Sequence, residues 1–258
     1  MVMCHDTGRK RRRMAPEDRR KAILDAAQAL YTAHGWDDVT IADVLQEARI
    51  SKGGFYHHFS AKEDLLAAVV TRLAHQSLAA AEAARRNASG DALARLNAFL
   101  TGSLRWKAEN VAELRVFAEV LTKPGNDVLF HRVLDATAEA VIPALEGVIA
   151  EGIRDRSFDV PDPRLAAEVI VGLSLGRRQV LDNAMALAAS GDLEQATMLF
   201  NERMQAEGAT CDRLLGLPPG SILLSNPENY RRMLAGLVDH IHSDARVATN
   251  GNAINEEA

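Results

Sequence analysis

The chain has 258 residues, of which 47% are hydrophobic and 25% are charged; this is the balance of a globular protein and excludes a wholly disordered one. No stretch approaches the roughly 18 uncharged apolar residues of a transmembrane helix, and the basic N-terminus has no apolar run behind it, so we expect neither a membrane span nor a secretory signal. The two cysteines, Cys4 and Cys211, argue against a disulfide framework and fit a reducing cytoplasm.

Charge is distributed unevenly along the chain. The formal net charge is −5, which by itself argues against a nucleic-acid partner. However, residues 1–62 hold 11 Lys/Arg and 8 Asp/Glu, so this part is basic and the remainder is acidic. The split predicts a small basic module joined to a larger acidic one. The basic run Arg9–Arg13 is either a solvated tail or a functional arm.

The first predicted helix begins at Pro16 and ends before Gly35. Proline suits the first helical position, the acidic residues that follow it complement the helix dipole, and glycine is a common terminator. A second, short helix is expected after Thr40, whose hydroxyl can cap it, with Asp43 placed three residues on as in a capping box. Each of the two helices has an apolar face at helical spacing.

A third short helix is expected from Ser51, a favourable N-cap, to about His58. Ser60 and Glu63 have the spacing of a capping box and predict a long fourth helix. Pro143 predicts a kink in one of the later helices. No alternating strand pattern is found, so the fold class is all-α, and the remaining helices are predicted by their period and by Gly, Pro and Ser breaks at 91–107, 111–122, 126–155, 163–189, 192–215 and 227–244.

The stretch Thr40–Lys62 reads as a short helix, a tight turn and a second short helix, which is a helix-turn-helix signature. Gly53 and Gly54 in the first turn of the second helix cost about 1 kcal/mol each relative to alanine, which indicates that the backbone there comes close to a partner. The free N–H groups and positive dipole of that turn favour an anion such as a DNA phosphate. The side chains that can contact the same DNA backbone are Lys52, Tyr56 and Lys62.

This region resembles the DNA-binding domain of the tetracycline-repressor (TetR) family of bacterial regulators. The resemblance runs from Lys21 to Val70, about 50 of the 258 residues, and a weaker similarity to the second domain of the family lies at 158–167. The residues that carry the main resemblance are Ile23–Ala27, Leu30, Gly35-Trp36, Val39–Val44, Ile50–Phe59 and Lys62–Leu66.

The resemblance implies a homodimer in which each subunit places Ser51–His58 in a major groove of a palindromic operator of double-stranded DNA. A small-molecule inducer bound by the C-terminal domain would loosen DNA binding, and the basic arm, including Arg11 and Arg12, would add non-specific affinity. The positions that match phosphate contacts of the family are Thr40, Lys52, Tyr56, His57 and Lys62. The positions that match the approach to base edges are Gly53, Gly54 and Phe55.

The sequence departs from the family pattern at three positions of this module. Ala42 stands where many members carry a longer polar side chain, which predicts poor base readout from the first helix of the pair. Leu45 replaces the usual alanine and implies altered helix packing. Arg49 replaces the usual glycine of the turn, where a left-handed conformation would cost roughly 1 kcal/mol. A further departure is Gly191–Ser225, which reads as an extra segment before the last helix.

Candidate ligand-binding residues in the second domain are aromatic or imidazole side chains at helical spacing, which either line a pocket or fill the core: Trp106, Phe117, Phe130 and His131. The adjacent histidines His57 and His58 point to different helix faces, and no Cys, Asp or Glu cluster has ligand spacing, so we expect no metal site and no cofactor. No catalytic motif is found, and the protein is not expected to be an enzyme.

Two functional hypotheses remain open. The first is a ligand-responsive transcriptional repressor released from its operator by an inducer. The second is a DNA-binding regulator of the same fold whose second domain binds a protein partner, and a well-formed apolar pocket would favour the first. A helical enzyme is a third hypothesis, which no sequence motif supports. The expected domains are a basic arm, a helix-turn-helix domain, a helical ligand-binding and dimerisation domain, and a disordered tail, at 1–15, 16–62, 63–245 and 246–258.

Overall fold

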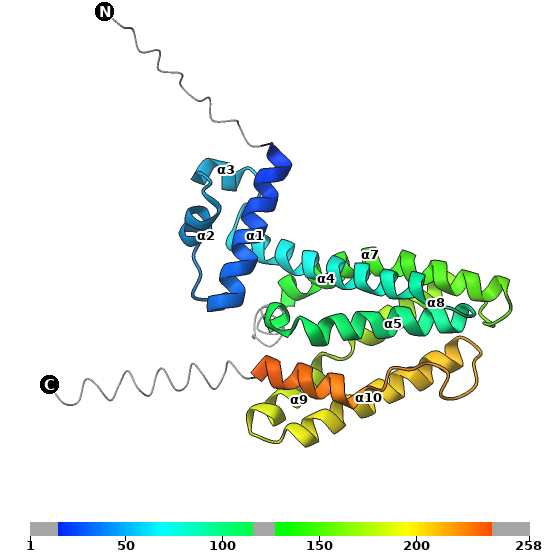
Figure 1. The fold of residues 1–258 in the computed structure, drawn as a ribbon. Coiled ribbons are helices and arrows are strands. Elements are labelled where there is room, and N and C mark those ends of the chain that lie inside the picture. The colour runs from blue at the N-terminus through cyan, green and yellow to red at the C-terminus, as the bar shows by residue number, and fades with distance from the viewer. Residues whose placement is uncertain (1–14, 116–126, 239–258) are drawn as a thin grey trace, which may run out of the picture. The chain divides into compact units, whose positions relative to one another are not determined.

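The computed structural model describes residues 15–115 and 127–238, and every regular element in these ranges is a helix (Figure 1). The all-α prediction is therefore confirmed. None of the helices in the described ranges is both long and apolar enough to cross a membrane. The elements are α1 Pro16–His34, α2 Ile41–Ala48, α3 Lys52–Tyr56, α4 Lys62–Asn87, α5 Ala92–Glu109, α7 Asp127–Arg154, α8 Pro163–Leu175, α9 Arg178–Ala189 and α10 Leu193–Leu214.

The chain divides into two compact units, one ending at Leu66 and one beginning at Ala67. In the first unit, α1 packs against α2 and α3. Its core is built from buried side chains of all three helices and of the segment after α3, which include Ile23, Tyr31, Val44, Phe55 and Phe59. The three helices thus share one core, which fixes α3 against α1.

The helix boundaries in the first unit follow the predicted signals closely. Proline occupies the start of α1, and Gly35 ends it with a φ of 77°. The third helix is shorter than predicted, because residues 57 and 58 form a turn after Tyr56. The capping interaction predicted between Ser60 and Glu63 is wrong: the backbone N–H and the hydroxyl of Ser60 both donate to the carboxylate of Asp64, because the helix starts at Lys62 and places Asp64 at the third position.

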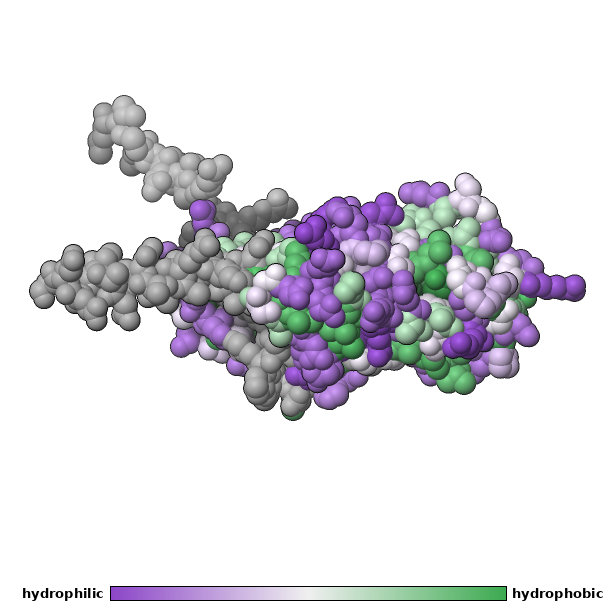
Figure 2. Space-filling view, turned by 90° about the horizontal axis from the view of Figure 1, so that it is seen from below, coloured by the Kyte–Doolittle hydropathy of each residue, from purple (hydrophilic) through white to green (hydrophobic). Residues whose placement is uncertain are grey.

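In the second unit, α7 packs against α5 and α8, and α10 packs against α9. The largest fully buried side chains in this unit include Leu96, Ile149, Met204 and Leu215. Figure 2 shows one face of the molecule, on which hydrophilic and hydrophobic side chains are interspersed.

The single helix predicted over 163–189 is wrong: α8 ends at Leu175, and α9 begins at Arg178. Glycine is a weak helix former, and a Cβ added to Gly176 would lie 3.2 Å from Arg203 Nη2. The guanidinium of Arg177 pairs with the buried carboxylate of Glu207 on α10. This ion pair beside the break joins segments 30 residues apart in sequence, a contact that local periodicity does not encode.

Two other predicted helices extend beyond the described residues, and a third contains a proline. Of the helix predicted at 111–122, residues 111–115 are helical and the rest lies outside the described range. Of the helix predicted at 227–244, residues 227–238 are helical and the last residues lie outside that range. Pro143 lies inside α7, which is assigned as one helix across it.

The segment Gly191–Ser225 is integral to the second unit. It contains α10 and the turn after it, in which Gly220 N and Ile222 N donate to the Asp212 carboxylate at 2.7 and 2.8 Å. Ile222 and Leu224 are buried in the same core as α10.

Candidate nucleic-acid interface and ligand cavity

A reciprocal capping box fixes the start of α2. Asp43 N donates to Thr40 Oγ1 at 3.2 Å, and Thr40 N donates to Asp43 Oδ2 at 2.8 Å. The Thr40 hydroxyl also donates to Asp43 Oδ2 at 2.6 Å. These bonds from Thr40 lower the pKa of the Asp43 carboxyl below its ordinary value, because they stabilise its charged form. The hydroxyl predicted to contact phosphate is thus the one that caps the helix.

The turn between α2 and α3 passes through a left-handed residue. Arg49 has φ 54° and ψ 41°, as the family pattern implied for the position usually held by glycine. Ile50 N then donates to the Leu45 carbonyl at 3.1 Å and closes the turn. Since Arg49 is exposed, its cationic side chain faces solvent at a position where the backbone conformation costs about 1 kcal/mol.

The predicted contact residues of α3 fall into two groups, exposed side chains and a buried one. Ser51 caps the helix by accepting from Gly54 N at 3.3 Å. The side chains of Lys52 and His57 are exposed, and Tyr56 retains 48% of its exposure. Phe55 has 0% exposure. The prediction that Phe55 approaches base edges is therefore corrected: its ring is a core residue, because the apolar face of α3 turns it towards α1.

The two adjacent glycines of α3 have different surroundings. A Cβ added to Gly53 would meet no atom within 4 Å. A Cβ added to Gly54 would lie 2.9 Å from Ile50 Cγ2 and 3.4 Å from Ser51 Oγ. Gly53 therefore offers an open backbone surface to a partner, whereas Gly54 is required by packing within the module.

This difference predicts opposite outcomes for two alanine variants. Gly53→Ala should leave the unfolding free energy of the protein unchanged or raise it by less than about 1 kcal/mol, because alanine is the better helix former. Gly54→Ala should lower it by about 1 kcal/mol or more, because the added methyl overpacks Ile50. Urea unfolding followed by circular dichroism compares the two; equal stability of the variants would contradict this assignment.

The last predicted phosphate contact, Lys62, lies against an aromatic ring. Its Nζ is 4.5 Å from the centroid of Trp36 and donates to the Asp37 carbonyl at 3.3 Å. A similar contact that the sequence did not predict places the Arg20 guanidinium 5.5 Å from the centroid of Phe59. Arg20 and Phe59 lie far apart in the sequence, so no local pattern predicts their contact. Arg11 and Arg12 lie outside the described residues.

A cavity of about 250 Å³ lies within the second unit. Most of its walls are apolar and come from α4, α5, α7 and the helix over 227–238, and its polar groups are few. Ser77 and Ser103 face each other in the lining, with their hydroxyl oxygens 3.0 Å apart. The other polar or charged lining residues are Lys107, Thr137, Ser174, Arg177 and Arg178.

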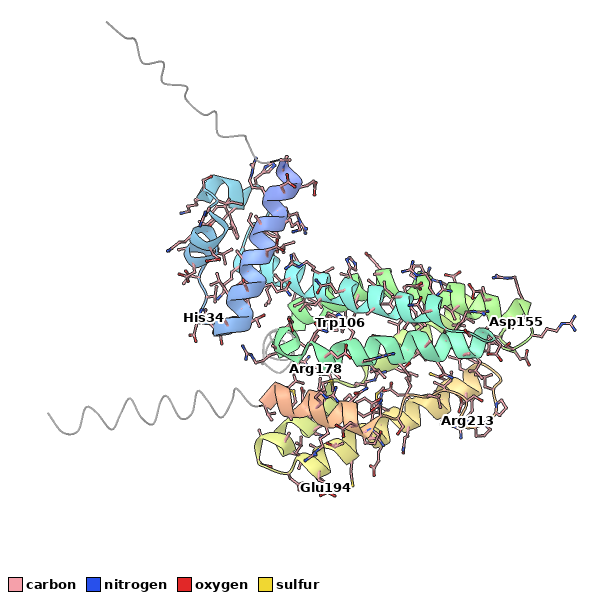
Figure 3. All side chains as sticks on the ribbon, viewed as in Figure 1. His34, Trp106, Asp155, Arg178, Glu194 and Arg213 are labelled. Atoms are coloured by element: carbon pink, nitrogen blue, oxygen red, sulfur yellow. The ribbon has the colours of Figure 1, made fainter. Side chains whose placement is uncertain are left out.

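The predicted ligand-binding residues are not all brought together. Trp106 lines the cavity, and Figure 3 labels it on α5 together with Arg178 of α9, which lines the same cavity. His131 is exposed and is not among the lining residues. Phe117 lies outside the described residues, as does the side chain of Phe130. The sequence analysis missed Lys107, although it continues the stripe formed by Leu96, Leu100 and Leu104 on α5.

The cavity borders a buried ion-pair cluster. Glu207 is 3% exposed and accepts from Arg177 Nε at 2.9 and 2.7 Å. Arg203 Nε donates to the same carboxylate at 2.7 Å. Two guanidinium groups thus neutralise one carboxylate, and the cluster keeps an excess positive charge beside the cavity.

The first unit is a helix-turn-helix module, the class of fold that sets its second helix against DNA. Residues 23–69 match the family model of the bacterial regulatory proteins of the tetR family. The match identifies this part of the chain as a TetR-family domain.

Individual proteins are similar to this chain, one in the sequence of this module and two in fold. The chain is 34% identical over 59 residues to the HTH-type transcriptional regulator SrpR of Pseudomonas putida, an alignment that covers 23% of this chain and 28% of SrpR. A TetR-family regulator from Pectobacterium atrosepticum has a similar fold, with a TM-score of 0.61, 20% identity and coverage of 81% of this chain and 100% of that one. RolR in complex with resorcinol is also similar in fold, with a TM-score of 0.56, 21% identity and coverage of 85% and 94%.

Proposed function

We propose that this protein is a transcriptional repressor that binds an operator in double-stranded DNA through α3. The observation that carries the proposal is the N-terminal turn of α3, where an exposed lysine, an open glycine and an exposed tyrosine lie within five residues. A helix N-terminus favours anions, so Lys52, the backbone at Gly53 and the Tyr56 hydroxyl form a phosphate-binding edge. The same helix is presented to the major groove.

A homodimer and a small-molecule effector complete this proposal. Two copies of α3 would match the two halves of a palindrome. The cavity of about 250 Å³ exceeds the roughly 150 Å³ that accommodates benzene, and its mixture of apolar walls and few polar groups is typical of ligand sites. Resorcinol, the ligand of the fold relative RolR, is of this size class. The cavity therefore supports a small-molecule effector over a protein partner for the second unit.

The effector would act by shifting a conformational population. If the dimer exchanges between forms with different spacing of the two α3 helices, a ligand that prefers the non-binding form weakens operator affinity by its differential affinity for the two. A tenfold weakening needs about 1.4 kcal/mol.

DNA that flanks the protein's own gene is the first substrate to test. Fluorescence anisotropy of labelled fragments, with excess non-specific competitor DNA, should reveal a fragment to which the protein binds tightly in spite of the competitor. A matched fragment with one half of the palindrome scrambled serves as the control and should bind much more weakly. If competitor removes all binding from every fragment, the proposal of an operator in this region fails.

The variant Lys52→Ala should weaken binding to all DNA sequences alike. Removing one phosphate contact should also reduce the slope of log K against log salt concentration by about one. Anisotropy titrations at four or five salt concentrations measure that slope. Lys21→Ala on α1 is the matched control, because Lys21 is exposed and pairs with Asp25. An unchanged slope for Lys52→Ala would remove this residue from the interface.

A further inference from the structure

The lining of the cavity in the second unit includes several cationic side chains. Three cationic residues lie in its lining, Lys107 on α5, Arg177 in the break after α8, and Arg178 at the start of α9. None of the lining residues in the described part of the chain is acidic. A carboxylate that compensates these cations therefore has to come from outside the lining or from a bound molecule.

The three cations differ in how well they are compensated. Arg177 pairs with Glu207, and Arg178 lies near the Asp182 carboxylate, which it influences electrostatically. Lys107 is half-buried, and among the described residues no hydrogen bond or ion pair reaches its Nζ. Burial and the nearby Arg177 together lower the pKa of Lys107 to about 8, so the ammonium is still the main form at neutral pH. Of the three cations, Lys107 is thus the one to which the described residues supply no partner.

The rest of the cavity is suited to an apolar body. Its walls include Leu73, Leu104, Val141, Phe200 and Met233. Their side chains favour a hydrocarbon group of roughly the size of one ring, given a volume of about 250 Å³ and the roughly 150 Å³ of a benzene-binding cavity. A ligand that matches both features has an apolar body and one anionic head.

We propose that the cavity binds a small organic monocarboxylate, with its carboxylate on Lys107 and its apolar body against the leucine and aromatic walls. The proposal deepens the effector part of the proposed function and rests on it. A charged group that is removed from water without a partner carries a large desolvation penalty. A carboxylate offsets that penalty with a charge-assisted hydrogen bond, whereas a neutral molecule of the same shape leaves the ammonium unpaired.

Isothermal titration calorimetry with the full-length protein tests the ligand class directly. The probes are benzoate, phenylacetate and hexanoate, each paired with its neutral amide. The variants are Lys107→Met, which keeps the chain length and removes the charge, and Lys107→Arg, which keeps the charge. Arg105→Met is the matched control, because Arg105 is an exposed cation on the same helix. Circular dichroism melts establish that each variant is folded.

The proposal predicts that at least one carboxylate binds at least about tenfold more tightly than its amide, the difference that one hydrogen bond to a charged group supplies. Lys107→Met should lose that preference, while Lys107→Arg and Arg105→Met should keep it. Failure of all three carboxylates to bind, equal binding of acids and amides, or full affinity in Lys107→Met would each overturn the proposal. If Lys107→Met does not fold, loss of binding in Lys107→Arg decides against it.

The same titrations separate this proposal from the proposed function. Operator binding is measured independently by anisotropy and does not depend on the cavity. If a neutral probe binds and releases the operator, the effector function stands and the carboxylate class is wrong. If the carboxylates bind with the predicted dependence on Lys107 but the protein binds no operator, the ligand class stands and the proposed function fails.

Discussion

Replacing Glu207 with alanine is expected to lower the free energy of unfolding by about 3–5 kcal/mol, the range for breaking a buried ion pair. The carboxylate is 3% exposed and accepts hydrogen bonds from Arg177 and Arg203. The variant leaves two guanidinium groups beside a buried site with no anion. Urea unfolding of the full-length protein, followed by circular dichroism, measures the change.

Glu202→Ala is the matched control for this prediction. Glu202 lies on the same helix and is exposed, so its loss should change the free energy of unfolding by less than about 0.5 kcal/mol. A loss below about 1 kcal/mol in Glu207→Ala would show that the cluster does not hold the break between α8 and α9 against α10.

The double variant Leu165→Glu, Val169→Glu is expected to split the proposed homodimer and to weaken operator binding by at least about 100-fold, because binding by two linked half-site contacts is lost. Both side chains point outward one turn apart on α8, with exposures of 56% and 37%. The opposite face of α8 is buried against the core. A Cβ added to Gly172, one turn further on, would meet no atom within 4 Å. This open apolar face is suited to a second copy of the chain.

Analytical ultracentrifugation gives the mass of the variant, and anisotropy gives its operator affinity. Leu223→Glu is the control, because Leu223 is an exposed leucine outside α8 at 59% exposure and should leave both results unchanged. A double variant that stays dimeric would place the dimer interface on another surface.

The first unit could be predicted from the sequence because its boundaries depend on local signals. The Thr40–Asp43 box and the Ser51 cap join residues three apart, and such contacts are encoded by spacing alone. The prediction that Ser60 pairs with Glu63 was wrong because the helix starts one residue later than expected, which makes Asp64 the partner of Ser60. The prediction that Phe55 approaches base edges was wrong for another reason. Its position in the family pattern did not show that its ring turns into the core.

The second unit was less predictable because its decisive contacts are distant in sequence. Arg177, beside the break between α8 and α9, pairs with Glu207, which lies 30 residues further along the chain. Lys107 looks like a surface residue unless its place on the apolar stripe of α5 is considered. That stripe was the available signal, since a cation at a partly buried stripe position needs a partner. The position of Trp106 in the cavity lining could be anticipated, because aromatic side chains at helical spacing face the interior of a helical bundle.

The most direct test of the central claim, that α3 is the DNA-contacting helix, is the operator affinity of the double variant Lys52→Ala, Tyr56→Ala, measured by fluorescence anisotropy beside the wild type and Lys21→Ala. We expect the double variant to lose about 100-fold in affinity, because each contact to a phosphate contributes about 1.4 kcal/mol, while its melting curve stays close to that of the wild type. A folded double variant that binds the operator as tightly as the wild type would contradict the account.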